Sequence, residues 1–321
     1  MSRLVPWAFA EPAAMTRAFA GEADRWRRAL AWETADLWAG IARARETGQL
    51  PGLAALRDDG RLAGWTYFLR RDDDLQVGAL SADTPADTAA LVDGVLARPE
   101  AGRAGRLLLF AFSDAPDCDV VLSGRGFEVE DYLYLERPVG AGRGPAPPGR
   151  PWALGDLEAT AALLRAAYPM ADPLRPFASD GQPAAWRRYV DDLVEGDGCG
   201  RYRPQQSVVL PGAAGALDAA ALVTDLGVGS AHLAQIAVRP ERQGQGLATA
   251  LVDEVARRCA EAGAVRLTLL VAAANTAARQ LYARTGFVPR ARFTFAVRVT
   301  AAAGVRRAAA GHAAALITRA G

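Results

Sequence analysis

The chain has 321 residues, about twice the length of an ordinary single domain, so two domains are expected. Its 51% hydrophobic and 23% charged residues exclude wholesale disorder and are typical of a soluble globular protein. The 37 basic residues nearly balance the 36 acidic ones, which argues against a basic nucleic-acid-binding protein. All 37 basic residues are arginines, so Schiff-base chemistry and phosphate-loop chemistry that depend on lysine are excluded.

The first half is predicted to begin with amphipathic helical structure over residues 23–46. Three short strands are expected next, at 52–56, 62–69 and 75–80, followed by a helix at 88–97. Residues 107–111 are apolar at every position, which predicts a strand buried on both faces of a sheet. A shorter helix and a strand at 128–136 end this half.

Residues 139–151 are rich in Gly and Pro, which predicts a semi-rigid linker between domains at 1–138 and 152–300. The second half is predicted to repeat the order of the first. It has helices at 157–167 and 186–194, strands at 207–210, 219–224 and 231–238, a helix at 247–262, an apolar strand at 267–271 and a last strand at 290–299. The tail at 301–321 shows no firm period and is expected to be partly disordered.

An internal repeat supports this division. The sequence Ala-Leu-Val-Asp occurs at 90–93 and again at 250–253, and Gly-Phe occurs at 126–127 and at 286–287. Between them, Arg-Leu-Leu-Leu at 106–109 aligns with Arg-Leu-Thr-Leu at 266–269. All three pairs share one offset of 160 residues, which indicates two copies of one domain.

No metal site, disulfide framework or membrane segment is expected. The three cysteines, Cys118, Cys199 and Cys259, lack C-x-x-C spacing, and two histidines add too few ligands for a zinc cluster. The sequence has no run of 18 uncharged apolar residues and no signal-peptide pattern at its start. We therefore expect a cytoplasmic protein that binds neither membranes nor nucleic acid, and the sequence leaves its oligomeric state open.

The strongest chemical signal lies between residues 231 and 287. A predicted strand at 231–238 is followed by Gln243-Gly244-Gln245-Gly246-Leu247-Ala248 and then by a helix. Two glycines at the start of a helix let the backbone approach an anion, and the unpaired N–H groups of the first turn can bind it. A dinucleotide-binding loop fits less well, because the first glycine lies six residues after the predicted strand instead of at a tight turn.

The segment from Gln243 to Ala248 resembles the Q/R-x-x-G-x-G/A signature of the Gcn5-related N-acetyltransferase (GNAT) superfamily. The stretch from Asn275 to Phe287 is similar to the N-x-x-A-x-x-L-Y-x-x-x-G-F pattern of the same superfamily. The resemblance implies an α/β (α+β) protein with two tandem GNAT-like domains. Each would be a mixed, mostly antiparallel twisted sheet flanked by helices, in a layout similar to that of the mycothiol synthases.

The resemblance also implies acetyl-CoA as co-substrate, without a metal. Its pyrophosphate would be bound by the loop amides of Gln243, Gly244, Gln245, Gly246, Leu247, Ala248 and Thr249. Backbone groups of Ile236 and Val238 would pair with the pantetheine arm where two strands splay apart. Asn275 would hydrogen-bond the pantetheine, and Tyr282 would protonate the departing thiolate as general acid.

The general base is less clear from the sequence. Many relatives carry a glutamate on the strand before the loop or on the following apolar strand, but 233–236 and 267–270 contain no carboxylate here. His232 has a suitable intrinsic pKa and is the candidate base. Ordered water, or entry of the amine in its neutral form, would also serve.

The first copy is predicted to have lost the cofactor chemistry. Under the 160-residue offset, Gln245 aligns with Pro85, which has no amide N–H, and Tyr282 aligns with Leu122. The sequence therefore predicts an acetyl-CoA-dependent N-acetyltransferase whose second domain acts on a primary amine, in a small molecule or a peptide, by direct attack in a ternary complex. The alternatives are a non-catalytic acyl-CoA-binding or scaffolding protein and a peptide or protein N-terminal acetyltransferase.

Overall fold

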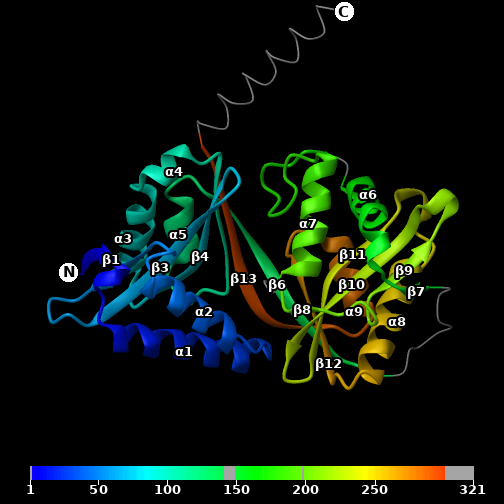
Figure 1. Cartoon of the computed structure of the whole chain (residues 1–321), viewed down its shortest axis with the longest axis horizontal. Coiled ribbons are helices and arrows are strands. Elements are labelled where there is room, and N and C mark those ends of the chain that lie inside the picture. The colour runs from blue at the N-terminus through cyan, green and yellow to red at the C-terminus, as the bar shows by residue number, and fades with distance from the viewer. Residues whose placement is uncertain (1, 141–148, 169, 197–198, 301–321) are drawn as a thin grey trace, which may run out of the picture. The chain divides into compact units, whose positions relative to one another are not determined.

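The computed structural model describes residues 2–140, 149–168, 170–196 and 199–300, and it divides into two compact units (Figure 1). Unit 1 consists of Met1–Glu22, Ala35–Asp131 and Phe293–Gly321, and unit 2 of Ala23–Thr34 and Tyr132–Arg292. No helix within the described ranges is long and apolar enough to cross a membrane.

Unit 1 is built on a sheet with the strand order β1-β2-β3-β4-β5-β13. The strands are β1 (Arg3–Pro6), β2 (Gly52–Leu56), β3 (Leu62–Arg71), β4 (Asp74–Ala82), β5 (Arg106–Ala111) and the end of β13 (Val288–Val299). Only the β4–β5 pair is parallel among the described pairs of this unit. The helices are η1 (Trp7–Phe9), α1 (Pro12–Leu30), α2 (Ala35–Glu46), α3 (Pro85–Leu96), α4 (Pro99–Arg103) and α5 (Cys118–Ser123).

Helices cover both faces of the sheet in unit 1. On one face α3 packs on β2, β3 and β4, and its Leu91 is fully buried. On the other face Trp65 of β3 contacts Phe19 of α1 and Trp38 of α2, with ring centroids 5.2 and 5.7 Å away. The faces differ because successive strand residues point in opposite directions. Each face is apolar, so both layers of helices contribute to the core.

Unit 2 has the strand order β6-β12-β11-β10-β9-β7, with β8 paired to β10. Its strands are β6 (Glu128–Pro138, of which 132–138 lie in this unit), β7 (Arg150–Pro151), β8 (Arg201–Tyr202), β9 (Val208–Pro211), β10 (Leu217–Gly227), β11 (Ser230–Val238) and β12 (Arg266–Ala272). Only β11 and β12 form a parallel pair among the described pairs. The helices are η2 (Leu154–Asp156), α6 (Leu157–Ala167), α7 (Pro183–Glu195), η3 (Ala213–Gly215), η4 (Pro240–Arg242), α8 (Leu247–Glu261) and α9 (Thr276–Arg284).

The sheet of unit 2 also has a helical layer on each face. The cluster that contains α8 places Val252 and Val255 against strand residues such as Leu267. The opposite cluster contains α6 and α7, and its Trp186 is fully buried against strand residues such as Leu222. The fold class predicted from the sequence, a mixed and mostly antiparallel sheet flanked by helices, is confirmed in both units.

The units follow the element order that the repeat predicts, but strand pairing divides the chain differently from the predicted 1–138 and 152–300. The end of β13 pairs with β5 and belongs to unit 1, for example Val297 opposite Leu108. The end of β6 pairs with β12 and belongs to unit 2, for example Leu135 opposite Leu269. Each unit is therefore completed by the last strand of the other half of the sequence, because hydrogen-bonded pairing and not chain order decides where a strand belongs.

Two other segments differ from expectation. The helical region predicted at 23–46 consists of the end of α1 and of α2, separated by Ala31 with a φ of 51°, which lies outside the right-handed helical region. The predicted linker includes β7, which pairs with β9. The rest of that linker at 141–148 and the tail at 301–321 lie outside the described residues.

Strand β6 supplies unit 2 with a buried arginine. Arg137 Nη1 lies 3.2 Å from Asp253 Oδ1 of α8 and donates to the carbonyl of Thr285, just after α9, at 2.7 Å. Its guanidinium lies 5.7 Å from the centroid of the Phe287 ring. The Arg137 and Asp253 side chains are only 8% and 15% exposed. Removing either charge would leave the other buried without a counterion, so this pair holds α8 and α9 to β6.

We expect Arg137→Met to lower the free energy of unfolding by about 3–5 kcal/mol, because it leaves the Asp253 carboxylate uncompensated. The matched control is Arg125→Met, which breaks an ion pair with Asp93 whose side chains are 24% and 59% exposed, and it should cost about 1 kcal/mol or less. Urea denaturation followed by tryptophan fluorescence measures both. Equal losses in the two variants would contradict a special role of Arg137.

Candidate active site

The candidate site begins where two parallel strands part. Strand β11 pairs with β12 only over residues 230–232, ending at His232 opposite Thr268. Beyond that point β11 continues to Val238 with β10 as its neighbour, and the register with β10 skips one residue at Ala234, which marks a bulge. The last six residues of β11 therefore have one edge that no described strand occupies, and such an edge can accept an extended ligand as an additional strand.

Side-chain amides occupy backbone groups on this part of β11. The N–H of Ile236 donates to Oε1 of Gln235 at 3.0 Å, and the carbonyl of Val238 accepts from Nε2 of Gln243 at 3.2 Å. Ile236 and Val238 are the residues predicted to pair with pantetheine. Each of these backbone groups is hydrogen-bonded to a side-chain carboxamide and not to a neighbouring strand. The secondary amides of an extended ligand can therefore form hydrogen bonds with them by displacing these side chains.

The predicted phosphate loop lies between η4 and α8. Gly244 and Gly246 have φ angles of 74° and 78°, in the left-handed region that favours glycine, and Gly246 is the N-cap of α8. Within the described chain, no protein group accepts a hydrogen bond from the six consecutive amides of residues 244–249. The first turn of α8 contains no acidic residue. These amides and the positive end of the helix dipole form a site for an anion.

Two arginines attach the loop to strand β10. Arg239 donates through Nε and Nη2 to the carbonyl of Leu217 at 3.1 and 2.9 Å. Arg242 forms an ion pair with Asp218 at 3.2 Å. Both contacts are with β10, so the loop is fixed to the sheet through side chains while the backbone amides of its glycine-rich part stay unpaired. The sequence motif did not reveal these anchors, because the partner residues lie more than twenty positions earlier in the chain.

Tyr282 is placed close to the loop by α9. It is 6% exposed and belongs to the same apolar cluster as Ile236, Leu247 and Ala248. Its ring packs edge-to-face on Phe287 at 5.6 Å, and its hydroxyl has no hydrogen-bond partner among the described residues. Burial, and to a lesser extent the neighbouring Tyr168, raises the pKa of Tyr282, so the phenol is protonated at neutral pH. Tyr282 therefore carries a phenolic proton close to the loop.

Asn275 has a structural role at the start of α9. Its Oδ1 accepts a hydrogen bond from the N–H of Ala278 at 3.1 Å, so it is the N-cap of the helix that carries Tyr282. The side chain is exposed, and Nδ2 has no acceptor among the described residues. Capping does not use the amide NH₂ group, which leaves it available to a ligand.

His232 lies deep in the unit. It is 4% exposed, its Nδ1 is 2.9 Å from Oγ1 of Thr268, and its ring is stacked between Trp32 at 5.9 Å and Tyr134 at 6.1 Å. Burial lowers the pKa of His232 to about 4, so the imidazole is neutral at pH 7. The contacts of its ring are with Thr268 of β12, Tyr134 of β6 and Trp32, whereas Tyr282 packs in the cluster that contains α8 and α9. The prediction that His232 is the base stays a prediction.

An aromatic cluster lies on the other face of β11. Phe177 stacks on Tyr189 at 4.6 Å, and Tyr168 stacks on Trp186 at 5.5 Å. The guanidinium of Arg175 lies 4.9 Å from the centroid of the Trp186 ring. The hydroxyl of Tyr189 accepts from Gln235 Nε2 at 3.1 Å, which links this cluster to the edge of β11. The segment between α6 and α7 is thereby tied to the strand that carries Ile236.

The corresponding position of unit 1 has no such loop. The connection from β4 to α3 consists of Asp83 and Thr84 only, whereas residues 239–246 connect β11 to α8. Thr84 caps α3 by accepting from the N–H of Asp87, and the buried Asp87 carboxylate pairs with Arg57 at 2.9 Å. The N-terminus of α3, which would face a phosphate, thus already has the carboxylate of Asp87 beside it. The connection in unit 1 is shorter than the one in unit 2. The two loops therefore cannot be aligned residue by residue in the way that the 160-residue offset suggests.

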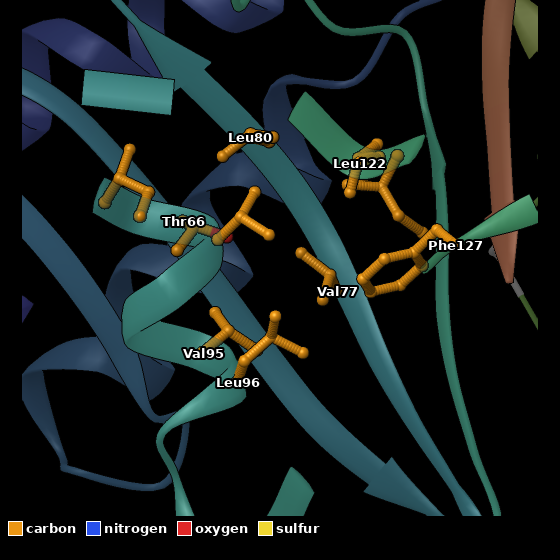
Figure 2. A pocket seen from close by; sticks show the side chains of 10 residues that line it. Thr66, Val77, Leu80, Val95, Leu96, Leu122 and Phe127 are labelled. Carbon is orange, nitrogen blue, oxygen red and sulfur yellow. The ribbon is translucent and has the colours of Figure 1, made fainter. Parts of the chain in front are cut away.

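Apolar side chains also fill the region between α3 and the sheet of unit 1. They leave a cavity of about 10 Å³, too small for more than one water molecule. Figure 2 shows Val77 and Leu80 of β4, Val95 and Leu96 of α3, and Phe127 around this cavity. A cavity of this size cannot contain a pantetheine arm.

Comparison with known proteins agrees with the geometry of unit 2. Residues 172–287 match the family model described as the acetyltransferase (GNAT) family. No curated protein matches the sequence.

Three solved structures resemble the whole chain. A GCN5-related N-acetyltransferase from Sphaerobacter thermophilus is 18% identical, with a TM-score of 0.59 over 92% of this chain and 95% of that one. A tandem GNAT protein from the clavulanic acid biosynthesis pathway is 13% identical, with a TM-score of 0.56 over 93% and 98%. The glucosamine N-acetyltransferase region of a fungal multi-domain β-N-acetylglucosaminidase is 13% identical, with a TM-score of 0.60 over 93% and 38%. At these identities the similarity shows the fold.

The buried His232 predicts a pH dependence of stability. The pKa is about 4 in the folded chain and 6.5 without burial, so protons bind the unfolded chain preferentially between these values. Stability should fall as the pH decreases from 7 to 5, by about 2 kcal/mol from this residue. We expect this part of the loss to be absent in His232→Gln, measured by urea denaturation at both pH values.

An unchanged pH dependence in His232→Gln would contradict this assignment. The same variant tests His232 as general base. If His232 accepts the proton of the amine, kcat should fall by about 10²–10⁴ at pH 7.5.

Proposed function

We propose that unit 2 transfers an acetyl group from acetyl-CoA to a primary amine by direct attack in a ternary complex, and the match of residues 172–287 to the acetyltransferase (GNAT) family model supports this. The observation that carries this proposal is the combination of six unpaired amides at the start of α8 with an unoccupied edge of β11 beside Tyr282. A diphosphate, an extended diamide and a thioester follow one another in acetyl-CoA, and these three features suit them in that order.

The residues present fit this co-substrate. The amides of 244–249 suit the two phosphates, and no lysine is needed because backbone N–H groups and the helix dipole provide the positive potential. The N–H of Ile236 and the carbonyl of Val238 suit the pantetheine amides, which would replace the carboxamides of Gln235 and Gln243. When bound, acetyl-CoA supplies an activated acyl group attached to a thiolate leaving group.

Tyr282 is proposed as the general acid. Its raised pKa keeps the phenol protonated until a thiolate forms, and its hydroxyl is not committed to another protein group in the described residues. Proton transfer from the phenol would prevent the thiolate from attacking the new amide. Burial in the cluster with Phe287 restricts the ring, so the hydroxyl is pre-positioned and little reorganisation is required.

Proton removal from the amine needs no carboxylate in this proposal. The strand segments 233–236 and 267–270 carry none. An amine that enters in its neutral form can attack the thioester directly and lose its proton afterwards to water. This predicts that kcat/KM rises with pH up to the pKa of the free amine, because only the neutral form of the substrate reacts.

Unit 1 is proposed to bind no acetyl-CoA. Its short β4–α3 connection, the Asp87 carboxylate at the start of α3 and the filled space beneath the sheet each oppose binding. The first half of the sequence nevertheless contributes to unit 2, since the end of β6 and the segment that contains Trp32 belong to that unit. One acetyl-CoA per chain is the consequence.

Substituting Gly246 by Ala should weaken acetyl-CoA binding by about tenfold or more, because a Cβ is strained at a φ of 78° and projects from the backbone that approaches the phosphates. The matched control is Gly263→Ala, which has a φ of 87° and equally open space at the other end of α8. Isothermal titration calorimetry should give one site per chain, with the weaker affinity in the Gly246→Ala variant and an unchanged affinity in the control. Two sites of equal affinity would overturn the inactivity of unit 1.

Substituting Tyr282 by Phe should lower kcat by about 10²–10⁴ and leave the acetyl-CoA dissociation constant nearly unchanged, because only proton donation is removed. Release of free thiol from acetyl-CoA with a panel of amines provides the measurement. Tyr202→Phe, in the cluster with Trp152 on the opposite face, is the control and should retain kcat. Binding without turnover by the unsubstituted protein on every amine would favour a non-catalytic acyl-CoA-binding protein.

A further inference from the structure

Unit 1 contains a pocket of about 200 Å³ that plays no part in the proposed reaction. It lies between η1, the α2–β2 loop, β3 and the connection from α3 to α4. Its lining includes the apolar side chains of Trp7, Pro51 and Phe68 and the charged side chains of Arg45, Arg98 and Glu100. Pockets for drug-sized ligands measure about 300–1,000 Å³, so an occupant of this pocket must be smaller.

Arg45 is a buried cation in the wall of this pocket. It is 7% exposed, and its Nε and Nη2 donate to the carbonyls of Trp7 and Ala10 at 2.8–3.2 Å. Its Nη1 has no acceptor, and no carboxylate forms an ion pair with it within the described residues. Burial of a charge without a counterion is unfavourable, so an anionic group beside Nη1 would be stabilised.

The other two charged side chains are also unpaired. Arg98 has no hydrogen bond or ion pair from its guanidinium in the described part of the chain, although Glu100 is only two residues away. Oε2 of Glu100 is buried and has no hydrogen-bond partner. A guanidinium without a described counterion, at Arg45, therefore lines the same small pocket as a guanidinium and a carboxylate without described side-chain partners, at Arg98 and Glu100. Buried polar groups of a folded protein are normally hydrogen-bonded, and such exceptions point to a missing partner.

We propose that this pocket binds a small α-amino acid, with its carboxylate at Arg45 and Arg98 and its ammonium group at Glu100. A simple anion would be repelled by Glu100, and a simple cation by the two arginines. A zwitterion pairs with all three groups, and charge-assisted hydrogen bonds to guanidinium and carboxylate are the strong ones. The apolar wall formed by Pro51 and Phe68 suits a short aliphatic side chain, and the volume excludes a long one.

The test uses the full-length protein without acetyl-CoA and three probes that differ in one group each. L-Alanine carries both charges, propionate lacks the ammonium group, and ethylamine lacks the carboxylate. Ligand-observed NMR titrations should show alanine binding about tenfold or more tightly than either of the other two. Equal binding of propionate and alanine, or no binding of alanine, would overturn the proposal.

Variants locate the site within unit 1. Arg98→Gln and Glu100→Gln should each weaken alanine binding by about tenfold or more, and neither removes a side-chain hydrogen bond found among the described residues. Arg61→Gln is the charge-matched control, because Arg61 is exposed in the turn between β2 and β3 and does not line the pocket. Alanine binding that both pocket variants leave unchanged would place the site elsewhere, for instance at the acceptor side of unit 2, and would also overturn the proposal.

Discussion

The short parallel pairing between β11 and β12 is the constraint on which the candidate site depends. Three residue pairs hold the strands together, and then β11 continues along β10 alone. If the pairing continued to Val238, the backbone groups of Ile236 and Val238 would be used within the sheet. Because it stops at His232, the rest of β11 keeps an edge that no described strand occupies, followed in the chain by a helix start with unpaired amides. On this part of β11, the backbone groups of Ile236 and Val238 are hydrogen-bonded to the carboxamides of Gln235 and Gln243.

Unit 1 shows that the fold alone does not create this site. It also contains a parallel pair, β4–β5, and a helix after the first strand of that pair. However, a two-residue connection cannot bend away from the helix and present a row of amides. Instead Thr84 caps α3, and Asp87 with Arg57 satisfies the charge at the helix start. Unit 1 therefore has a capped and internally neutralised helix start at this position, which stabilises the unit without a ligand.

Rigid packing surrounds the site in unit 2. His232 is enclosed by Trp32 and Tyr134, and the hydroxyl of Tyr134 donates to the carbonyl of Leu30 at 2.9 Å. Arg137 holds α8 and α9 through Asp253 and the Thr285 carbonyl. Several of these residues come from the first half of the chain, although they belong to unit 2. The second half alone would lack the strand and the aromatic segment from the first half that complete the core of unit 2.

The sequence by itself determined the local features of this protein. Apolar periodicity and turn residues placed the strand at 52–56 and the helix at 157–167 where the structure has them, and the glycines at 244 and 246 lie at the start of a helix as the sequence predicted. These features depend on neighbours in the chain, so a single sequence contains the information. The tertiary structure alone decided which strand completes which unit, that Arg137 lies against Asp253, that His232 is buried between two aromatic rings and that Gln235 occupies the Ile236 amide. These contacts depend on burial and on strand pairing between distant parts of the chain. The spacing of residue types along the sequence therefore does not reveal them.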